Sequence, residues 1–377
     1  MLLSYGVKNF CCFKNWLEID LSFNANVPDE ISESFGAAKA LCIKGANASG
    51  KTNALKVLSF LSFFCVSSFS QEPEDEIPVE PFFDSSEPSE FYVRFRIGEV
   101  DYIYELAVTK KEVVSEKIFK KEKRKVLILD RERLKTNKTL TSEKVNVSER
   151  KNASVISVAK QYVLKEFEPF YDFFKNIRTN VNFFGLRDDP WRRVNVSCKL
   201  YLENPSIFTL VKEYLLKFDT GISDIEIQVD KNAKASDIWY PVFYSTVDGA
   251  LKKLEYRSQS RGTQILFDLL LIYFQSLENG SVLVLDEFDV YLHPDILPHL
   301  VKLFLEDTNK KNAQLIFSTH NNEIIDYMGK YRTVICNKVN GECFAYRLDE
   351  IKTGLLRNDR SILPIYKTGR LGGIPRI

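Results

Sequence analysis

The stretch Gly45-Ala46-Asn47-Ala48-Ser49-Gly50-Lys51-Thr52 decides the fold. It matches the pattern G-x-x-x-x-G-K-[ST], in which a glycine-rich turn points its backbone N–H groups inward around an anion. The pattern predicts that Lys51 reaches the β- and γ-phosphates of a nucleotide and that the Thr52 hydroxyl holds Mg²⁺. The residues expected to cradle the phosphates are Gly45, Asn47, Ala48, Ser49, Gly50, Lys51, Thr52 and Asn53.

The residues on both sides of this loop favour the same interpretation. Residues 40–43 are typical of a buried strand, and residues 53–58 are typical of a helix. A helix that begins near Thr52 directs the positive end of its dipole at the same phosphates. The alternative is a glycine-rich turn that binds nothing, and the strand–loop–helix order disfavours it.

The composition is that of an ordinary globular protein. With 377 residues, 45% of them hydrophobic and 27% charged, the chain can form one large α/β domain with insertions or two domains. The seven cysteines show no C-x-x-C spacing, so we expect reduced thiols in a cytoplasmic protein and no zinc site. Residues 55–69 are apolar, but Lys56 and four serines interrupt them and they are too short to span a membrane.

A pair of antiparallel strands is expected ahead of the phosphate loop. Residues 2–10 and 16–21 alternate in the manner of strands and are separated by a short turn. The end of the first strand and the turn after it read Lys8-Asn9-Phe10-Cys11-Cys12-Phe13, which has the form K-N-F-x-x-F.

A second informative region lies far along the chain. Ser281-Val282-Leu283-Val284-Leu285-Asp286-Glu287 is a short apolar run that ends in two carboxylates, as expected for a parallel strand buried on both faces. Asp286 is predicted to hold Mg²⁺ through water, opposite Thr52. Glu287 is predicted to orient and deprotonate the attacking water as a general base. The alternative is that these carboxylates cap a following helix.

Two further segments complete the candidate site. Ser258-Gln259-Ser260-Arg261-Gly262-Thr263-Gln264 precedes a long apolar helix, so Ser260 and Gly262 would offer a second anion site at a helix N-terminus, or simply a helix cap. The run of residues 314–321 is typical of a strand that ends at His320, which we expect to contact the γ-phosphate and to position the water.

The charge of the chain is unevenly distributed. Residues 110–160, from Lys110 to Lys160, contain sixteen Lys/Arg and seven Asp/Glu, a net charge of +9 in a chain whose formal net charge is +1. This asymmetry is typical either of a nucleic-acid footprint or of a solvated face on a β-rich insertion. Residues 160–220 are helical and aromatic in pattern, and we expect them to form a smaller lobe.

The order of these motifs resembles that of ATP-binding-cassette-type ATPases of the SMC/RecF/OLD-like group. The resemblance is carried by residues 8–13, 45–52, 260–263, 283–294 and 318–321. The chain is most similar to bacterial AAA family ATP-binding proteins whose Walker B segment reads D-E-x-D-x-x-L-H-P. Further marks are Pro81-Phe82-Phe83 and a C-terminal segment that runs from Tyr366 through Gly372-Gly373 to Pro375.

The resemblance implies an α/β fold: a P-loop NTPase of ABC/SMC-head type, with a mixed sheet, an antiparallel N-terminal β-subdomain and an inserted helical lobe. It divides the chain into an N-terminal half of the ATPase core (residues 1–110), a basic β-rich and helical insertion (111–220) and a C-terminal half (221–377). In this group the segment around Ser260 contacts the γ-phosphate of a second subunit, so two ATP molecules are sandwiched in a homodimer. Gln259 stands where relatives often have an acid. Gln71 is either the glutamine that senses Mg²⁺ or an ordinary loop residue.

The function implied is an ATPase that uses ATP and Mg²⁺, with Lys51, Glu287 and His320 as catalytic residues. Relatives are commonly paired in bacterial anti-phage defence operons with an effector, a nuclease or a toxin. About 55 residues follow His320, too few for the Toprim nuclease domain of OLD-class relatives. The alternative is a RecF-like clamp on DNA or RNA, held by residues 110–160. No membrane partner is expected.

Overall fold

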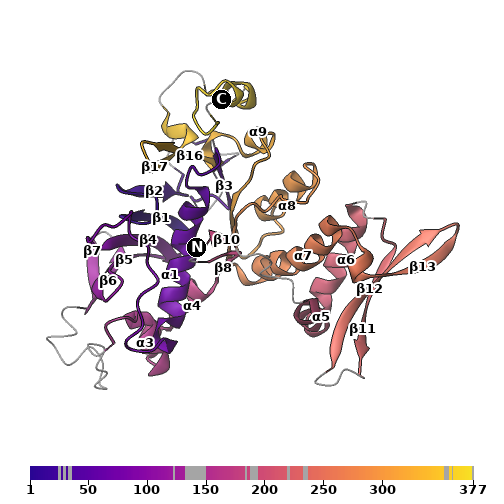
Figure 1. Cartoon of the computed structure of the whole chain (residues 1–377), viewed down its shortest axis with the longest axis horizontal. Helices are drawn as coiled ribbons and strands as arrows, with labels where there is room; N and C mark the ends of the chain where they lie inside the picture. The colour runs from indigo at the N-terminus through magenta and orange to yellow at the C-terminus, as the bar shows by residue number, and fades with distance from the viewer. Residues whose placement is uncertain are drawn as a thin grey trace.

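The phosphate-loop strand lies in the middle of a six-stranded sheet of the computed structural model, in the order β17-β16-β3-β15-β14-β8 (Figure 1). The structure describes residues 1–23, 27–28, 31–32, 36–121, 124–131, 150–182, 185–186, 194–218, 221–231, 237–351, 356–358 and 360–375. The strands of this central sheet are β3 (Ala40–Gly45), β8 (Ile177–Thr179), β14 (Val282–Leu285), β15 (Gln314–Ser318), β16 (Thr333–Val339) and β17 (Glu342–Arg347).

The central sheet is parallel except at one edge, where β17 pairs antiparallel with β16. Every residue of β3, β14 and β15 is buried, as expected for parallel strands covered on both faces. Because the carboxyl ends of parallel strands meet at one edge of the sheet, the segments that follow β3, β14 and β15 come together there. These segments are the phosphate loop, the Asp286-Glu287 pair and the His320 loop.

A second sheet of six strands is antiparallel, in the order β2-β1-β4-β5-β6-β7, which confirms the expected N-terminal β-subdomain. Its strands are β1 (Leu2–Lys8), β2 (Leu17–Asp20), β4 (Ser89–Ile97), β5 (Val100–Val108), β6 (Val113–Lys121) and β7 (Lys125–Asp130). The expected boundary at residue 110 falls between β5 and β6, which pair along their length. We therefore propose to extend the N-terminal unit through β7.

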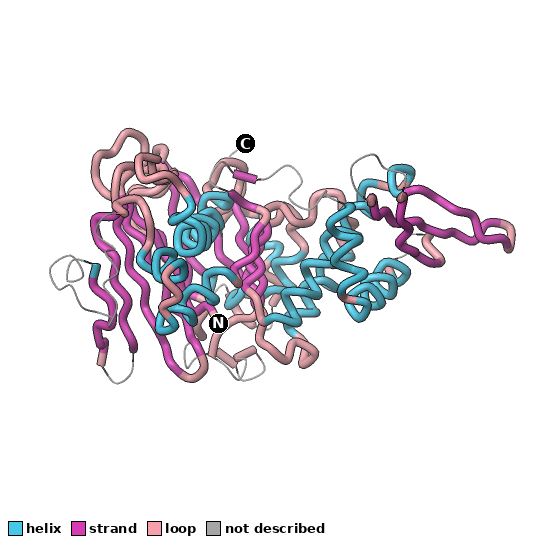
Figure 2. The backbone as a smooth tube through the Cα atoms, turned by 90° about the horizontal axis from the view of Figure 1, so that it is seen from below, coloured by secondary structure: helices cyan, strands magenta, loops and turns pink. Residues whose placement is uncertain are grey.

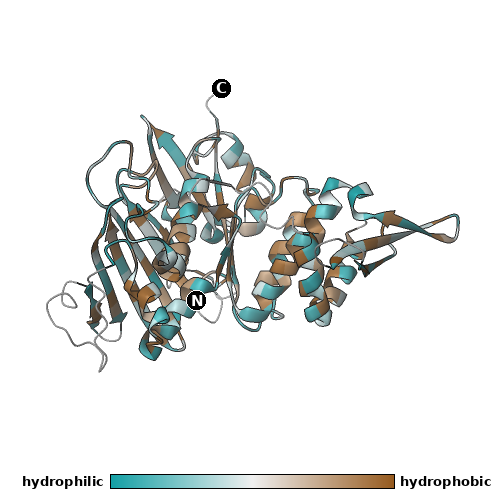
Figure 3. Cartoon of the chain, turned by 60° about the horizontal axis from the view of Figure 1, so that its bottom comes forward, coloured by the Kyte–Doolittle hydropathy of each residue, from teal (hydrophilic) through white to brown (hydrophobic). Residues whose placement is uncertain are grey.

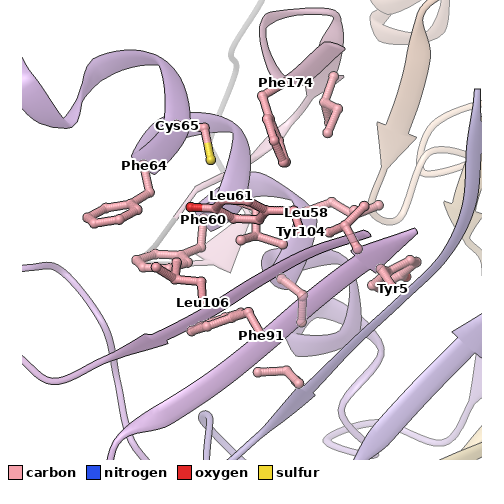
Figure 4. Close-up of a cluster of buried hydrophobic side chains, with 14 of the residues drawn as sticks. Tyr5, Leu58, Phe60, Leu61, Phe64, Cys65, Phe91, Tyr104, Leu106 and Phe174 are labelled. Atoms are coloured by element: carbon pink, nitrogen blue, oxygen red, sulfur yellow. The ribbon is translucent and has the colours of Figure 1, made fainter. Parts of the chain in front are cut away.

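Helix α1 (Lys51–Ser67) lies between the two sheets and belongs to a hydrophobic core that includes residues of both. Figure 4 shows the part of this core where side chains of α1 meet those of the antiparallel sheet. Phe60 stacks on Phe64 and on Phe91 of β4, with ring centroids 5.5 and 4.7 Å apart. The helical run Lys51–Ser70 is long and apolar enough to cross a membrane, yet 61% of its apolar window is buried inside the fold. This burial fits the core helix that the sequence predicts.

A second lobe extends from the central sheet and ends in a three-stranded arm, seen on the right of Figure 1 and in profile in Figure 2. Its elements are α5 (Val194–Glu203), α6 (Pro205–Lys217), β11 (Asp224–Asp230), β12 (Ile238–Val247), β13 (Ala250–Glu255) and α7 (Arg261–Asn279). Figure 3 shows hydrophobic residues along the helices of this lobe, which share one core with β14, β15 and α8 (Ile296–Leu305). The lobe therefore continues beyond residue 220, the end expected from the helical and aromatic pattern of residues 160–220.

The remaining elements cover the sides of the two sheets. They are α3 (Val155–Gln161), α4 (Glu168–Lys175), β9 (Val181–Asn182), β10 (Gly185–Leu186), α9 (Ile324–Met328) and α10 (Leu363–Lys367), with short 3-10 helices at Ser68–Ser70, Lys165–Phe167, Tyr256–Ser258, Lys330–Arg332 and Leu348–Glu350. Helix α10 and the segment after it form a third, smaller core with Ile335 of β16. This core attaches the C-terminal segment to the edge of the central sheet.

Candidate nucleotide-binding site

The phosphate loop leaves the end of β3 and enters α1 at Lys51. Ala48 and Gly50 have left-handed backbone conformations, with φ of 61° and 98°. A Cβ on Gly45 would lie 2.3 Å from the Ser49 Oγ and 2.6 Å from the Cys336 carbonyl oxygen, so this position has room for glycine only. The turn is therefore as tight as the sequence pattern predicts.

Lys51 is folded back into its own loop. Its side chain is buried, and its Nζ donates hydrogen bonds of 3.0 Å to the carbonyl oxygens of Gly45 and Ala46. Burial lowers the pKa of Lys51, although Asp286 and Glu287 act in the opposite sense. Two neutral carbonyl groups compensate a buried ammonium only partly, so an anion in the loop is a better partner for it.

Other loop residues leave polar groups open to a ligand. Asn47 and Ala48 are exposed, whereas the Ser49 hydroxyl is buried and has no hydrogen-bond partner among the described residues. The first N–H groups of a helix have no acceptor within the helix, so those at the start of α1 are available to phosphate oxygens. The Asn53 side chain points elsewhere, because its Nδ2 donates to the Cys12 Sγ at 3.2 Å.

The two distant halves of the sequence meet at Thr52 and Asp286. The Thr52 Oγ1 donates to the Asp286 Oδ2 at 2.5 Å, across 234 residues of sequence. Asp286 is buried, its Oδ1 accepts a hydrogen bond from the Ser318 hydroxyl, and its backbone is held by Asn180. The Asp286 N–H donates to the Asn180 Oδ1 at 2.7 Å, and the Asn180 Nδ2 donates to the Asp286 carbonyl oxygen at 2.9 Å.

Glu287 follows in a left-handed conformation, with φ of 45°, which is uncommon for a residue other than glycine. Its N–H donates a hydrogen bond of 2.9 Å to the Ser318 Oγ. The Glu287 Oε1 lies 3.6 Å from the His320 Nε2, and both side chains are partly exposed. The two side chains predicted to act on the water are thus adjacent.

The segment around Ser260 lies in the second lobe, at the start of α7. The Ser260 hydroxyl accepts a hydrogen bond from the Thr263 N–H at 3.1 Å and caps the helix, as the plainer interpretation expects. A Cβ on Gly262 would lie 2.8 Å from the Tyr291 carbonyl oxygen. Within the described part of the chain, Ser260 and Gly262 therefore contact this lobe and the loop after Glu287.

Three features of the site were missed or left open by the sequence. Gln71 follows the far end of α1, about 25 Å from Lys51 along a helix of this length, and this placement favours the loop interpretation. The sequence also missed Asn180, which directly follows β8 and whose side-chain amide bonds to the backbone of Asp286. The short run before it, Ile-Arg-Thr, is a weak strand signal that did not single it out.

Lys44 was also missed, although a lysine in the buried strand before the loop is unusual. Its Nζ donates to the carbonyl oxygens of Thr319 and Asn321, at 3.1 and 2.8 Å, and lies 5.9 Å from the centre of the Tyr366 ring. Burial lowers the pKa of Lys44. This side chain ties the strand before the phosphate loop to both sides of His320.

A cavity of about 750 Å³ opens beside the phosphate loop, between the His320 loop and the C-terminal segment. Its lining includes Ala46, Asn47, His320, Tyr366 and Gly373. The Gly373 N–H donates to the Asn337 Oδ1 at 2.7 Å, and the Tyr366 hydroxyl donates to the Gly373 carbonyl oxygen at 2.9 Å. The C-terminal segment from Tyr366 to Gly373 is therefore held beside the phosphate loop by hydrogen bonds.

The donor atoms fit Mg²⁺ held together with a nucleotide. Thr52 and Asp286 supply hard oxygen ligands, and Mg²⁺ typically takes one or two carboxylates together with phosphates and waters. Within the described residues, no group of three or more His, Cys, Asp or Glu side chains forms a metal site by itself. One hydroxyl from Thr52 and one carboxylate from Asp286 are the protein ligands expected when phosphate oxygens and waters complete the coordination of Mg²⁺.

The basic segment is only partly described. Residues 122–123 and 132–149 lie outside the described residues, and the rest of the segment includes β6 and β7 of the antiparallel sheet. In that sheet Lys125 pairs with Glu105 at 2.6 Å, and both side chains are exposed. The nucleic-acid hypothesis for Lys110 to Lys160 therefore stays a prediction.

The central sheet, the phosphate loop after β3 and the carboxylates after β14 define an α/β P-loop NTPase of ABC/SMC-head type. A solved structure, "Crystal structure of the SmcHead bound to the C-winged helix domain of ScpA", has a TM-score of 0.52 and 14% sequence identity, and the match covers 93% of this chain and 98% of that chain. A second, "SMC head domain from Thermotoga maritima", has a TM-score of 0.43 and 15% identity over 92% of this chain and 98% of that one.

The chain belongs to the AAA domain family described as a putative AbiEii toxin of a type IV toxin–antitoxin system, whose model matches residues 41–326. No curated protein matches the sequence. The match runs from β3 to α9 and so includes the phosphate loop, Asp286, Glu287 and His320.

Proposed function

We propose that this protein binds ATP with Mg²⁺, pairs with a second copy around two nucleotides and hydrolyses ATP in order to control an effector protein. The observation that carries the proposal is the 2.5 Å contact between the Thr52 hydroxyl and Asp286. It joins a phosphate loop to a buried carboxylate, which suits a site that holds Mg²⁺.

The residues of the loop bind and orient the triphosphate. Lys51 exchanges the Gly45 and Ala46 carbonyl oxygens for phosphate oxygens, and the free N–H groups of α1 and the Ser49 hydroxyl add donors. Mg²⁺, when bound at Thr52 and Asp286, neutralises charge on the β- and γ-phosphates. Fixed positive charge at these places stabilises the charge that develops as the γ-phosphoryl group is transferred.

Glu287 accepts the proton of the attacking water, and His320 orients that water against the γ-phosphate. The 3.6 Å separation of their side chains supports a shared role, because two groups this close can contact the same water beside them. Asn321 and Thr319, on either side of His320, are tied to Lys44 of the loop strand. A movement of the phosphate loop on binding phosphate would therefore be passed through Lys44 to the residues on either side of His320.

Pairing of two copies would complete the site. Ser260 and Gly262 lie at the N-terminus of a 19-residue helix in the second lobe, where helix dipole and backbone N–H groups favour an anion. A second copy in head-to-tail orientation would present this helix end to the γ-phosphate. Closure around ATP and opening after hydrolysis then give two states that an effector can distinguish.

The effector is proposed to be a nuclease or toxin encoded next to this protein, in bacterial anti-phage defence. The family description names a toxin–antitoxin system, which supports action with a partner protein. Co-purification of tagged Glu287→Gln protein with its operon neighbours, with and without ATP, tests this. A partner retained only with ATP supports the proposal, and a lack of any partner under both conditions contradicts it.

The ATPase is tested with matched variants. Wild-type protein is expected to hydrolyse ATP and Glu287→Gln to lose at least a hundredfold in turnover while it still binds ATP and accumulates as a dimer. Glu323→Gln, an exposed carboxylate near His320, is the control and should keep full turnover. Wild-type turnover in Glu287→Gln would contradict the role of Glu287.

A second candidate is a RecF-like clamp on DNA or RNA, which the net charge of +9 over residues 110–160 favours. Phosphate contacts from this segment would make binding fall steeply as salt increases. Neutralising its lysines should then remove both the affinity and the salt dependence. Equal nucleic-acid binding by the neutralised variant would reject the clamp.

A further inference from the structure

Two cysteines lie against the glycine that opens helix α1. A Cβ placed on Gly50 would lie 2.9 Å from the Cys12 Sγ and 3.1 Å from the Cys343 Sγ, so both sulfurs contact the same point of the phosphate loop. The Cys343 N–H donates to the Cys12 carbonyl oxygen at 2.8 Å, and the two thiols share a hydrogen bond. This backbone hydrogen bond keeps the two residues next to each other, as a disulfide between them requires.

The pair joins two parts of the fold. Cys12 is in the turn between β1 and β2 of the antiparallel sheet, and Cys343 is in β17 at the edge of the central sheet. The Asn53 Nδ2 also donates to the Cys12 Sγ, at 3.2 Å, so the first turn of α1 contacts the same sulfur. A bond between these sulfurs would cross-link both sheets directly over the phosphate loop.

Cys12 differs from the other cysteines in its chemical state. A hydrogen bond from the Cys343 thiol, together with one from Asn53, lowers the pKa of Cys12, and its side chain is partly exposed. Burial raises the pKa of the cysteines that lie elsewhere in the chain, which are Cys11, Cys42, Cys65, Cys198 and Cys336. Because the thiolate is the nucleophile, Cys12 should be the first cysteine to react with a small oxidant.

We propose that Cys12 and Cys343 form an oxidisable dithiol site, which hydrogen peroxide converts to a disulfide that weakens nucleotide binding at the adjacent phosphate loop. The Cys12 thiolate attacks one peroxide oxygen, so that an S–O bond forms, the O–O bond breaks and hydroxide leaves. The Cys343 sulfur then attacks the Cys12 sulfur, the S–S bond forms, and the S–O bond breaks with loss of hydroxide. The Cys343 proton and the proton from solvent convert both hydroxides to water.

The effect on nucleotide binding follows from the position of Gly50 and rests on the proposed function. Phosphate entry requires Lys51, the next residue, to leave the carbonyl oxygens of its own loop. A disulfide packed on Gly50 would hold the loop in this closed arrangement. We expect oxidation to weaken Mg²⁺-ATP binding about tenfold and a dithiol reductant to restore it.

The first test is made on the wild-type chain and does not depend on nucleotide. Protein treated with hydrogen peroxide is digested without reduction and mapped by mass spectrometry. We expect one linked peptide pair, Cys12 with Cys343, that has lost two hydrogen atoms and is absent after reduction. Recovery of both cysteines as free thiols after peroxide treatment, or a bond from Cys12 to another cysteine, would overturn the dithiol site.

The second test measures Mg²⁺-ATP affinity before and after oxidation in matched variants. Cys12→Ser and Cys343→Ser should lose the response to peroxide, whereas Cys11→Ser should keep it, since the Cys11 Sγ instead contacts Glu80 at 3.5 Å. An unchanged affinity in mapped, disulfide-linked wild-type protein would overturn the effect on nucleotide binding. Absence of ATP binding in the reduced protein would instead refute the proposed function, while the peptide map still stands.

Discussion

Asp268 is a buried carboxyl group in α7 and offers a quantitative test of the second lobe. Its Oδ1 accepts a hydrogen bond from the Ser197 hydroxyl at 2.9 Å, and its Oδ2 accepts one from the Tyr256 hydroxyl at 3.0 Å. Tyr256 also receives, at its carbonyl oxygen, a hydrogen bond of 3.0 Å from the Gln264 Nε2. The carboxyl group therefore anchors the segment that carries Ser260 and Gly262.

Burial raises the pKa of Asp268 from 3.8 to about 7. A raised pKa means that the folded protein holds this proton more tightly than the unfolded chain does. The contribution of Asp268 to stability is therefore most favourable below pH 4, is lost as the pH rises through the window between 3.8 and 7, and is constant above it. At 1.36 kcal/mol per pKa unit, the full loss is at most about 4 kcal/mol.

Asp268→Asn should remove this loss, because the amide has the same shape, stays neutral and can still accept from Ser197. We expect the free energy of unfolding of the variant to exceed that of wild type by about 2–4 kcal/mol at pH 8 and to match it within about 1 kcal/mol at pH 4. The measurement is urea unfolding, followed by fluorescence, at several pH values. Asp307→Asn, at an exposed position, is the control and should show no such trend.

A stability difference between Asp268→Asn and wild type that does not depend on pH would contradict the raised pKa of Asp268. So would a variant that is less stable than wild type at pH 8. Either result would mean that Asp268 is ionised without cost in the folded protein, so that desolvation does not control its pKa.

Three further predictions concern single positions. Thr52→Ala should abolish the Mg²⁺ dependence of ATP binding measured by calorimetry, while Thr52→Ser keeps it, since only the hydroxyl contacts Asp286. Gly373→Ala should cost about 2–4 kcal/mol of unfolding free energy, because its φ is 73° and its Cβ would lie 2.9 Å from the Ile335 Cγ2. The control Gly341→Ala, with a φ of 86° and open space around it, should cost about 1 kcal/mol. Arg131→Met should lower the free energy of unfolding by about 3–5 kcal/mol, because it leaves buried Glu116 without its ion pair. Lys125→Met breaks an exposed ion pair and should lower it by less than about 1 kcal/mol. Chemical denaturation measures both values.

The fold was predictable wherever a motif and its flanking pattern agreed. The apolar runs before Gly45 and Asp286 predict buried parallel strands, and the rule that such strands end at one edge brings Thr52 and Asp286 together. The helix after the loop and the N-terminal hairpin were predictable from their periodicity. Each of these patterns is formed by several residues that are neighbours in the sequence, so no contact between distant segments is needed to recognise it.

The features that were missed depend on contacts between distant segments. Nothing beside Asn180 shows that it will hold the backbone of Asp286, and a glutamine at position 71 looks equally suitable until the length of α1 places it at the far end. Lys44 resembles an accidental charge in an apolar run until its acceptors on either side of His320 are seen. The sequence did not show how far the antiparallel sheet extends, because the lysines of β6 and β7 hid the pairing of β6 with β5 and of β7 with β6.

Calorimetric titration of ATP into wild type, Lys51→Ala and Asp286→Asn measures whether the two halves of the chain form one Mg²⁺-nucleotide site. We predict binding by wild type that requires Mg²⁺ and is weakened at least tenfold in both variants. Binding that is indifferent to Mg²⁺ and equal in all three proteins would contradict a single site formed by both halves.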